Sequence, residues 1–275
     1  MPTSQSTEFV YPAVPSDLQY LHDVEIGNGG NRTLKIEICY PKTVSSTPWP
    51  ALVYIHGGGW NHGSKDLHAK KIIGYAKKGY IGVAIQYRLT GEAIFPAQIE
   101  DCKLAIRYLR AHAEHYHLNP NKIGVWGTSA GSHLASLLGT LPEGKFEGTG
   151  GWTSYSSRVQ AVVDWYGPAD FTTQFANDYS SVTALLGVNA FADLEKARSV
   201  MPGTYASSDT PPFLIMHGTA DKTIPFTDSE TFYNTLIEAG VNATLIPVEG
   251  AGHGLAAYPW ASNTVWKFLD QHLKK

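Results

Sequence analysis

Cysteine is scarce in this chain of 275 residues, which contains only Cys39 and Cys102. Two cysteines are too few for a disulfide framework, and neither belongs to a CxxC pair or a zinc-like cluster. We expect both to be buried thiols. This composition fits a cytoplasmic protein, but a secreted protein whose signal peptide precedes this sequence would share it.

Charge and long apolar runs are also limited. Lys and Arg total 21 against 24 for Asp and Glu, and no basic block could neutralise a run of phosphates. Nucleic acid is therefore not an expected partner. No apolar run approaches membrane-spanning length, and the opening MPTSQSTEFVYP lacks a basic stretch followed by an apolar core. We expect neither a membrane association nor an export signal in this sequence.

What the chain does have is an alternation of short apolar runs with longer helical patterns. Hydrophobic residues make up 43% of the chain, and the length suits one domain over residues 1–275. Runs typical of buried strands are 51–57, 80–88, 122–127, 159–167, 212–218 and 243–250, with an antiparallel pair expected near 20–27 and 33–40. Helices are predicted near 65–78, 97–117, 130–139, 228–239 and 259–273. The pattern predicts the α/β class, with a mostly parallel central sheet and helices on both faces.

Two stretches lack a clear period. Residues 142–158 and 171–211 are rich in Gly, Ser, Thr and aromatic residues, which is typical of loops or of a small lid. We therefore expect a cap that is small or absent.

A candidate nucleophile lies between a predicted strand and a predicted helix, in Gly127-Thr128-Ser129-Ala130-Gly131. A Gly-x-Ser-x-Gly turn in this context strains its serine, and small residues on either side are needed because strand and helix approach closely. The turn places Ser129 at a helix N-terminus, where free N–H groups favour developing negative charge. A flexible loop with a capping serine is the alternative. The flanking strand and helix favour the nucleophile.

Three consecutive glycines follow the apolar run ALVYI, in His56-Gly57-Gly58-Gly59-Trp60. They let the backbone turn so that its N–H groups face a pocket, and we expect the N–H groups of Gly58, Gly59 and Ala130 to form an oxyanion hole. The alternatives are a flexible turn or a phosphate loop. No Lys-Ser or Lys-Thr follows at P-loop spacing, and no GxGxxG opens the next helix.

The general base and its acid are expected after the last strands. His253 lies between glycines in GAGHG, and Asp221 follows the run PFLIM in HGTAD, which gives the order Ser, Asp, His. Asp170 in GPADF is the alternative acid. His272 is the competing base, although it lies on a helical pattern beside lysines.

Other histidines are given structural roles. His56 precedes the nucleophile, so we interpret it as bonded to neighbouring loops. His112, His115 and His117 could suggest a metal, but they lack an HExxH pattern and a carboxylate partner at ligand spacing. Neither a metal nor an organic cofactor is expected.

Five motifs in this order, HGGGW, QYRLTGEAIFPAQIED, GTSAG, HGTADKTIP and GAGHG, resemble the α/β-hydrolase esterases related to the hormone-sensitive-lipase group, and in particular the BD-FAE-like subset. The resemblance covers about residues 20–273. It implies the α/β-hydrolase fold and carboxylesterase activity on short acyl, acetyl-sugar or feruloyl esters. It also implies Ser129, Asp221 and His253 as a triad with Gly58, Gly59 and Ala130 as oxyanion donors. Only about twenty residues precede the first predicted strand, so we do not expect the long helical N-terminal cap of the larger members.

The expected reaction is acyl transfer through an acyl-enzyme, with a small-molecule or carbohydrate-linked ester as substrate. Because the carboxyl ends of parallel strands converge on the binding crevice, we expect Trp60, Tyr87, Trp165 and Tyr166 to line the pocket, with plain core positions as the alternative. An amide-cleaving peptidase or formamidase uses the same constellation, and a binding protein that has lost catalysis is a further alternative. The sequence leaves the oligomeric state open.

Overall fold

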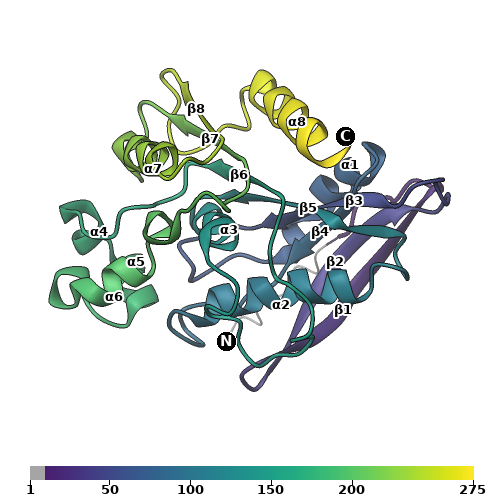
Figure 1. Ribbon diagram of the computed structural model, residues 1–275, viewed down its shortest axis with the longest axis horizontal. Helices are drawn as coiled ribbons and strands as arrows, with labels where there is room; N and C mark the ends of the chain where they lie inside the picture. The colour runs from purple at the N-terminus through teal and green to yellow at the C-terminus, as the bar shows by residue number, and fades with distance from the viewer. Residues whose placement is uncertain (1–9) are drawn as a thin grey trace, which may run out of the picture.

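The computed structural model describes residues 10–275 and contains one eight-stranded sheet with the order β1-β2-β4-β3-β5-β6-β7-β8 (Figure 1). The strands are β1 Leu18–Gly29, β2 Arg32–Pro41, β3 Trp49–Ile55, β4 Ile81–Ile85, β5 Leu118–Thr128, β6 Ala161–Trp165, β7 Phe213–Gly218 and β8 Ala243–Val248. The pairs β1–β2 and β2–β4 are antiparallel, and every pair from β4 to β8 is parallel. The predicted α/β-hydrolase fold, with its mostly parallel sheet, is confirmed. The expectation about an export signal rests partly on residues 1–9, which lie outside the described residues.

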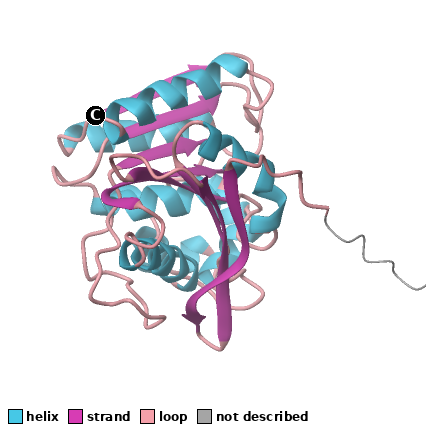
Figure 2. Ribbon diagram, turned by 90° about the vertical axis from the view of Figure 1, so that its right-hand side faces the viewer, coloured by secondary structure: helices cyan, strands magenta, loops and turns pink. Residues whose placement is uncertain are grey.

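Helices cover both faces of this sheet (Figure 2). On one face, α1 (Ala69–Lys77) and α8 (Pro259–Leu273) pack on an apolar cluster that includes Ile72 and Val265. On the other face lie α2 (Ala97–Ala111), α3 (Ala130–Thr140) and α7 (Phe226–Glu238). Because both faces are covered, β4 and β6 are buried along their whole length, which explains why both strands are apolar apart from Asp164.

Two helix boundaries differ from the prediction. The helix expected over 97–117 ends at Ala111, and the chain then turns through His117, which has a φ of 52°, before it enters β5. The stretch 65–78 divides into a 3₁₀ turn, η1 (Lys65–His68), and α1. The side chain of Ser64 caps η1 by accepting from the Asp66 N–H. Among the described residues, no helix has both the length and the apolarity needed to cross a membrane.

The cap segment, residues 171–211, holds short helices where loops or a small lid were expected. They are α4 (Gln174–Asp178), α5 (Ser180–Leu186), η2 (Ala190–Ala192), α6 (Leu194–Ser199) and η3 (Pro202–Tyr205). In Figure 1 these helices project beside α3 and α7 at one end of the molecule. Helices of five to seven residues are too short for a periodic sequence pattern to emerge, so the prediction missed them.

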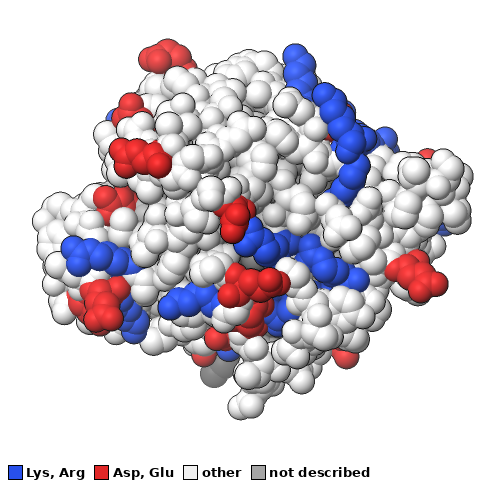
Figure 3. All heavy atoms as spheres, in the orientation of Figure 1, with Lys and Arg blue, Asp and Glu red and all other residues white. Residues whose placement is uncertain are grey.

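The other aperiodic stretch, 142–158, contains no helix or strand. It is tied to α2 by Glu147, which pairs with Lys103 at 2.7 Å and with Arg107 at 2.6 Å. Figure 3 shows basic and acidic side chains next to one another in this part of the surface. Cys39 and Cys102 are buried free thiols, as predicted.

Candidate active site

Ser129 occupies the turn between β5 and α3 with φ 54° and ψ −125°, a backbone conformation that is strained for a residue with a side chain. The two flanking glycines explain how the turn fits. A Cβ on Gly127 would lie 2.3 Å from the carbonyl oxygen of Gly131, and one on Gly131 would lie 2.1 Å from that of Ile55. No other residue can take these places without moving the backbone, so the turn holds the Ser129 hydroxyl at the carboxyl edge of the sheet.

Three side chains from separate loops form one hydrogen-bonded series. The Oγ of Ser129 lies 2.9 Å from Nε2 of His253, and Nδ1 of His253 lies 2.7 Å from Oδ2 of Asp221. Asp221 follows β7 and His253 follows β8, so both reach Ser129 from neighbouring strand ends. With Nδ1–H donating to the carboxylate, Nε2 is left free to accept the serine proton.

The carboxylate of Asp221 accepts hydrogen bonds on both oxygens. The N–H groups of Thr223 and Ile224 donate to Oδ1 at 2.7 and 3.1 Å. The other oxygen, Oδ2, lies 3.1 Å from Nε2 of His217 and also accepts from Nδ1 of His253. Burial by itself would raise the pKa of Asp221, but these hydrogen bonds outweigh it and hold the pKa well below the ordinary value. Asp221 is therefore ionised over the neutral range.

The glycine loop after β3 lies beside Ser129. Gly58 and Gly59 have φ values of 117° and 54°, and neither N–H donates a hydrogen bond to another described residue. Ala130 is the first residue of α3, so its N–H also lacks a partner within the helix. All three residues line the cavities that meet at Ser129. These three N–H groups are placed to donate hydrogen bonds to an oxyanion beside Ser129.

His56 stabilises the glycine loop through hydrogen bonds. Its Nδ1 lies 2.8 Å from the carbonyl oxygen of Gly57, and the hydroxyl of Tyr87 donates to the carbonyl oxygen of His56 at 3.0 Å. Burial lowers the pKa of His56 to about 4, although the bond to Gly57 acts in the opposite direction. His56 is therefore neutral above about pH 5 and acts as a structural donor.

Two cavities open at Ser129. The inner cavity is lined by Trp60, Pro168, Phe175, Tyr179, Val182 and Ile224 and has a volume of about 10 Å³, room for about one water molecule. The outer cleft is lined by His62, Thr128, Tyr166, Thr223 and His253 and has a volume of about 310 Å³. The inner cavity is thus small and mostly apolar, whereas the outer cleft is wide and is lined about equally by polar and apolar groups.

The four aromatic residues expected around the pocket divide into two pairs. Trp60 lines the inner cavity, and Tyr166 lines the outer cleft with its ring 4.7 Å from that of His253. Tyr87 and Trp165 line neither cavity. Tyr87 is buried against His56, and Trp165 is buried against Trp126 with ring centroids 4.8 Å apart, so both belong to the core.

The alternative acid and base lie elsewhere. The Oδ1 of Asp170 accepts from the N–H and hydroxyl of Thr172, within its own loop. His272 packs against Phe268 on α8. His112 and His117 bond to the carbonyl oxygens of Tyr108 and Ser45, and no group of metal-ligating atoms that includes His112, His115 or His117 was found among the described residues.

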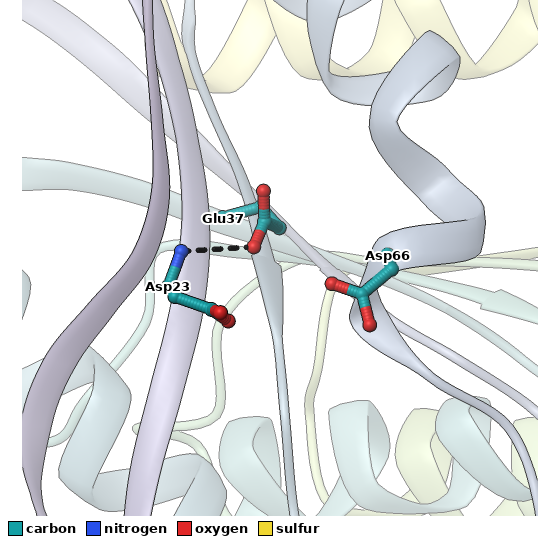
Figure 4. Close-up of side chains that lie close together, drawn as sticks. All are labelled: Asp23, Glu37 and Asp66. Atoms are coloured by element: carbon teal, nitrogen blue, oxygen red, sulfur yellow. Dashed lines mark hydrogen bonds between the residues drawn. The ribbon is translucent and has the colours of Figure 1, made fainter. Parts of the chain in front are cut away.

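One carboxylate cluster has ligand-like spacing. Asp23 of β1, Glu37 of β2 and Asp66 of η1 face one another (Figure 4). The ammonium of Lys65, which Figure 4 does not draw, lies 2.6 Å from Asp23, 2.7 Å from Glu37 and 2.6 Å from Asp66. Lys65 thus brings a positive charge into contact with all three carboxylates, and the cluster ties β1 and β2 to the segment that follows the glycine loop.

Comparison with known proteins places this site in a family. The BD-FAE family model matches residues 36–236. The chain belongs to the BD-FAE family. Its curated relatives include LipM of Mycobacterium tuberculosis, described as a probable carboxylic ester hydrolase, which is 32% identical over 79% of this chain and 52% of LipM. The chain spans about half the length of the curated relatives it matches.

Solved structures of similar size show the same fold. A truncated carbohydrate esterase from gut microbiota has 31% identity and a TM-score of 0.81, with 94% of this chain and 99% of that chain covered. Esterase 2 of Thermogutta terrifontis, solved with propionate bound, has 26% identity and a TM-score of 0.78, with 93% and 94% covered. The BD-FAE fold of this chain is therefore that of known esterases.

Proposed function

We propose that this BD-FAE chain is a serine carboxylesterase that cleaves short-chain acyl esters of bulky, polar alcohols, such as acetylated sugars. The observation that carries the proposal is the series from Ser129 through His253 to Asp221. Beside it lie the N–H groups of Gly58 and Gly59, which have no partner in the part of the chain that the structure describes. A serine nucleophile, a histidine base with its orienting acid and an oxyanion hole are together the requirements of acyl transfer.

The proposed reaction has two steps. His253 Nε2 takes the proton of Ser129 as Oγ bonds to the acyl carbon, and the oxyanion that forms is stabilised by the N–H groups of Gly58, Gly59 and Ala130. His253 then gives the proton to the leaving oxygen, and the alcohol departs from the acyl-enzyme. Water repeats the attack on the acyl carbon, and Ser129 regains its proton from His253.

The two cavities support the assignment of substrate class. An acyl group placed in the inner cavity meets Trp60, Val182 and Phe175, and the available volume of about 10 Å³ favours acetyl over a feruloyl ring. The alcohol then faces the outer cleft of about 310 Å³. The carbohydrate esterase among the relatives agrees with a sugar on this side.

The proposal is tested with matched substrates. Acetylated xylan and acetylated monosaccharides should be deacetylated faster than methyl ferulate is hydrolysed, and p-nitrophenyl acetate faster than p-nitroacetanilide. Acetate release and p-nitrophenol or p-nitroaniline release are the measurements. If amide turnover dominates, the protein is an amidase rather than an esterase. If methyl ferulate is hydrolysed faster than the acetylated sugars, the inner cavity does not hold a short acyl group.

A further inference from the structure

The triad acid is contacted by a second histidine that the proposed reaction does not use. His217, at the end of β7, is fully buried, and its Nε2 lies 3.1 Å from Oδ2 of Asp221 and 3.1 Å from the carbonyl oxygen of Ile224. Both neighbours can only accept. The Nε2 atom of His217 therefore carries a proton in either charge state of the ring.

The other ring nitrogen fixes the ring in place. Nδ1 of His217 lies 2.7 Å from the hydroxyl of Ser229 on α7, which is also buried. A neutral ring with its proton on Nε2 accepts from this hydroxyl, so Ser229 and Ile224 together set the orientation from which Nε2–H points at Asp221. Phe226 and Tyr166 also pack edge-on against this ring, with centroids 5.7 and 6.4 Å away.

The consequence lies in how the Asp221 carboxylate is occupied. His217 and His253 donate to Oδ2, and the N–H groups of Thr223 and Ile224 approach Oδ1, so each oxygen has two donors. A carboxylate oxygen accepts about two hydrogen bonds. Asp221 is thus fully occupied, and it cannot turn away from His253 without leaving a buried donor unpaired.

We infer that His217 is a positioning residue for the triad: with its ring held by Ser229, it donates to Asp221, keeps that carboxylate facing His253 and shares its negative charge. This inference rests on the proposed function. Two further carboxyl groups face the same ring, Asp164 from β6 and Asp228 from α7. Neither is within hydrogen-bond distance of His217, so Asp221 is the carboxylate that the ring serves.

The experiment compares two amides at position 217. The Nε2 of a glutamine can reach the place of the histidine Nε2, whereas asparagine is shorter and places its amide near Nδ1. His217→Asn therefore loses the donor to Asp221, and His217→Gln keeps it. Steady-state hydrolysis of p-nitrophenyl acetate is followed from pH 5 to pH 9 for both variants, with wild type and Ser129→Ala alongside.

For His217→Asn we expect kcat to fall about tenfold with KM unchanged, because one hydrogen bond to a charged group is lost and Asp221 does not touch the substrate. The acid limb of the kcat/KM profile should move to higher pH, because an Asp221 charge that is less shared holds a proton on His253 more strongly. His217→Gln should restore most of kcat and the wild-type acid limb. A wild-type profile in His217→Asn, or equal loss in both variants, would overturn the inference.

Ser229→Ala keeps the inference testable if His217→Asn does not fold. The loss of this hydroxyl loosens the ring without removing it, so a smaller shift of the acid limb in the same direction is expected, and a profile identical to wild type would overturn the inference. Turnover by wild type but not by Ser129→Ala tests the proposed function separately. If wild type is active and the His217 variants do not behave as expected, the role of His217 is overturned while the proposed function stands.

Discussion

At the scale of single residues, the strained backbone of Ser129 depends on packing that excludes any side chain at its neighbours. A Cβ at position 131 would lie 2.1 Å from a backbone oxygen of β3. Gly131→Ala should therefore destabilise the protein by about 3 kcal/mol and lower kcat/KM strongly, because β3 or the serine turn must move. Urea unfolding and p-nitrophenyl acetate hydrolysis measure the two effects.

Gly74 on α1 provides the matched control. A Cβ there would meet no atom within 4 Å. Gly74→Ala should leave activity unchanged and stabilise the protein by about 0.5–1 kcal/mol, because alanine loses less conformational freedom in a helix. Equal effects of the two substitutions would contradict the packing explanation.

The buried carboxyl group of Asp228 should make the stability of the protein depend on pH. Burial raises its pKa from 3.8 to about 6, although the N–H groups of Ala169 and Asp170 act in the opposite direction. The folded protein therefore binds this proton more tightly than the unfolded chain. The stabilisation from this proton is fully present below about pH 4 and is lost as the pH rises through about 6.

The substitution Asp228→Asn should remove this dependence while it keeps an acceptor for Ala169. The unfolding free energy of the variant relative to wild type should rise by about 2.5 kcal/mol between pH 4 and pH 7, at about 1.4 kcal/mol per pKa unit. Urea unfolding at a series of pH values measures it. A difference that stays constant with pH would contradict the raised pKa.

The sequence predicted Ser129, Asp221 and His253 from their strand-end positions, and the structure brings these three together. It did not predict His217, because a histidine within a buried strand is also what an ordinary core position looks like. Tyr87 and Trp165 lie at strand ends as expected, but strand-end position does not decide whether a ring faces the crevice or the core. That choice depends on the helices packed above it.

At the scale of elements, α5 of the cap segment sets the depth of the inner cavity. Val182 is buried and lines it. Val182→Ala should raise kcat/KM for p-nitrophenyl butyrate relative to acetate by about tenfold, because the removed methyl groups leave space for a longer acyl chain. Leu186→Val on the same helix, away from the cavity, is the control. An unchanged ratio in Val182→Ala would mean that the acyl group lies elsewhere.

The Lys65 cluster joins three elements, β1, β2 and η1, and its loss should lower the stability of the protein. The side chains of Lys65 and Glu37 are 3% and 0% exposed. Lys65→Met should destabilise the protein by about 3 kcal/mol, because the Glu37 charge is left buried without its partner. Lys35 reaches Asp23 only at 3.9 Å and is 35% exposed, so Lys35→Met should cost under about 1 kcal/mol. Equal losses in urea unfolding would contradict the account.

The strands and long helices were predictable because their patterns repeat over enough residues to be distinct. The predicted runs 212–218 and 259–273 match β7 and α8 within one residue. The cap helices were not predictable, because α4 and α6 have five and six residues and are held by caps from Thr173 and Asp193 rather than by an apolar face of their own.

At the scale of the whole molecule, the order of the sheet brings Ser129, Asp221 and His253 together, although they are far apart in the sequence.

Activity should rise with pH between 5 and 8, because a histidine base works only when neutral. The low pKa of Asp221 keeps the acid ionised throughout this interval, and His56 stays neutral above about pH 5. A flat pH–rate profile would contradict a histidine base.

Ser129 is the proposed nucleophile of an esterase, and its substitution gives the sharpest test of that role. Hydrolysis of p-nitrophenyl esters from acetate to laurate is followed for wild type and Ser129→Ala, with a fluorophosphonate label on both. We predict turnover that is fastest for the short acyl chains, labelling of wild type, and neither turnover nor labelling above background for Ser129→Ala. A Ser129→Ala protein that hydrolyses acetate at the wild-type rate, or a wild type that takes no label and shows no turnover, would contradict the account.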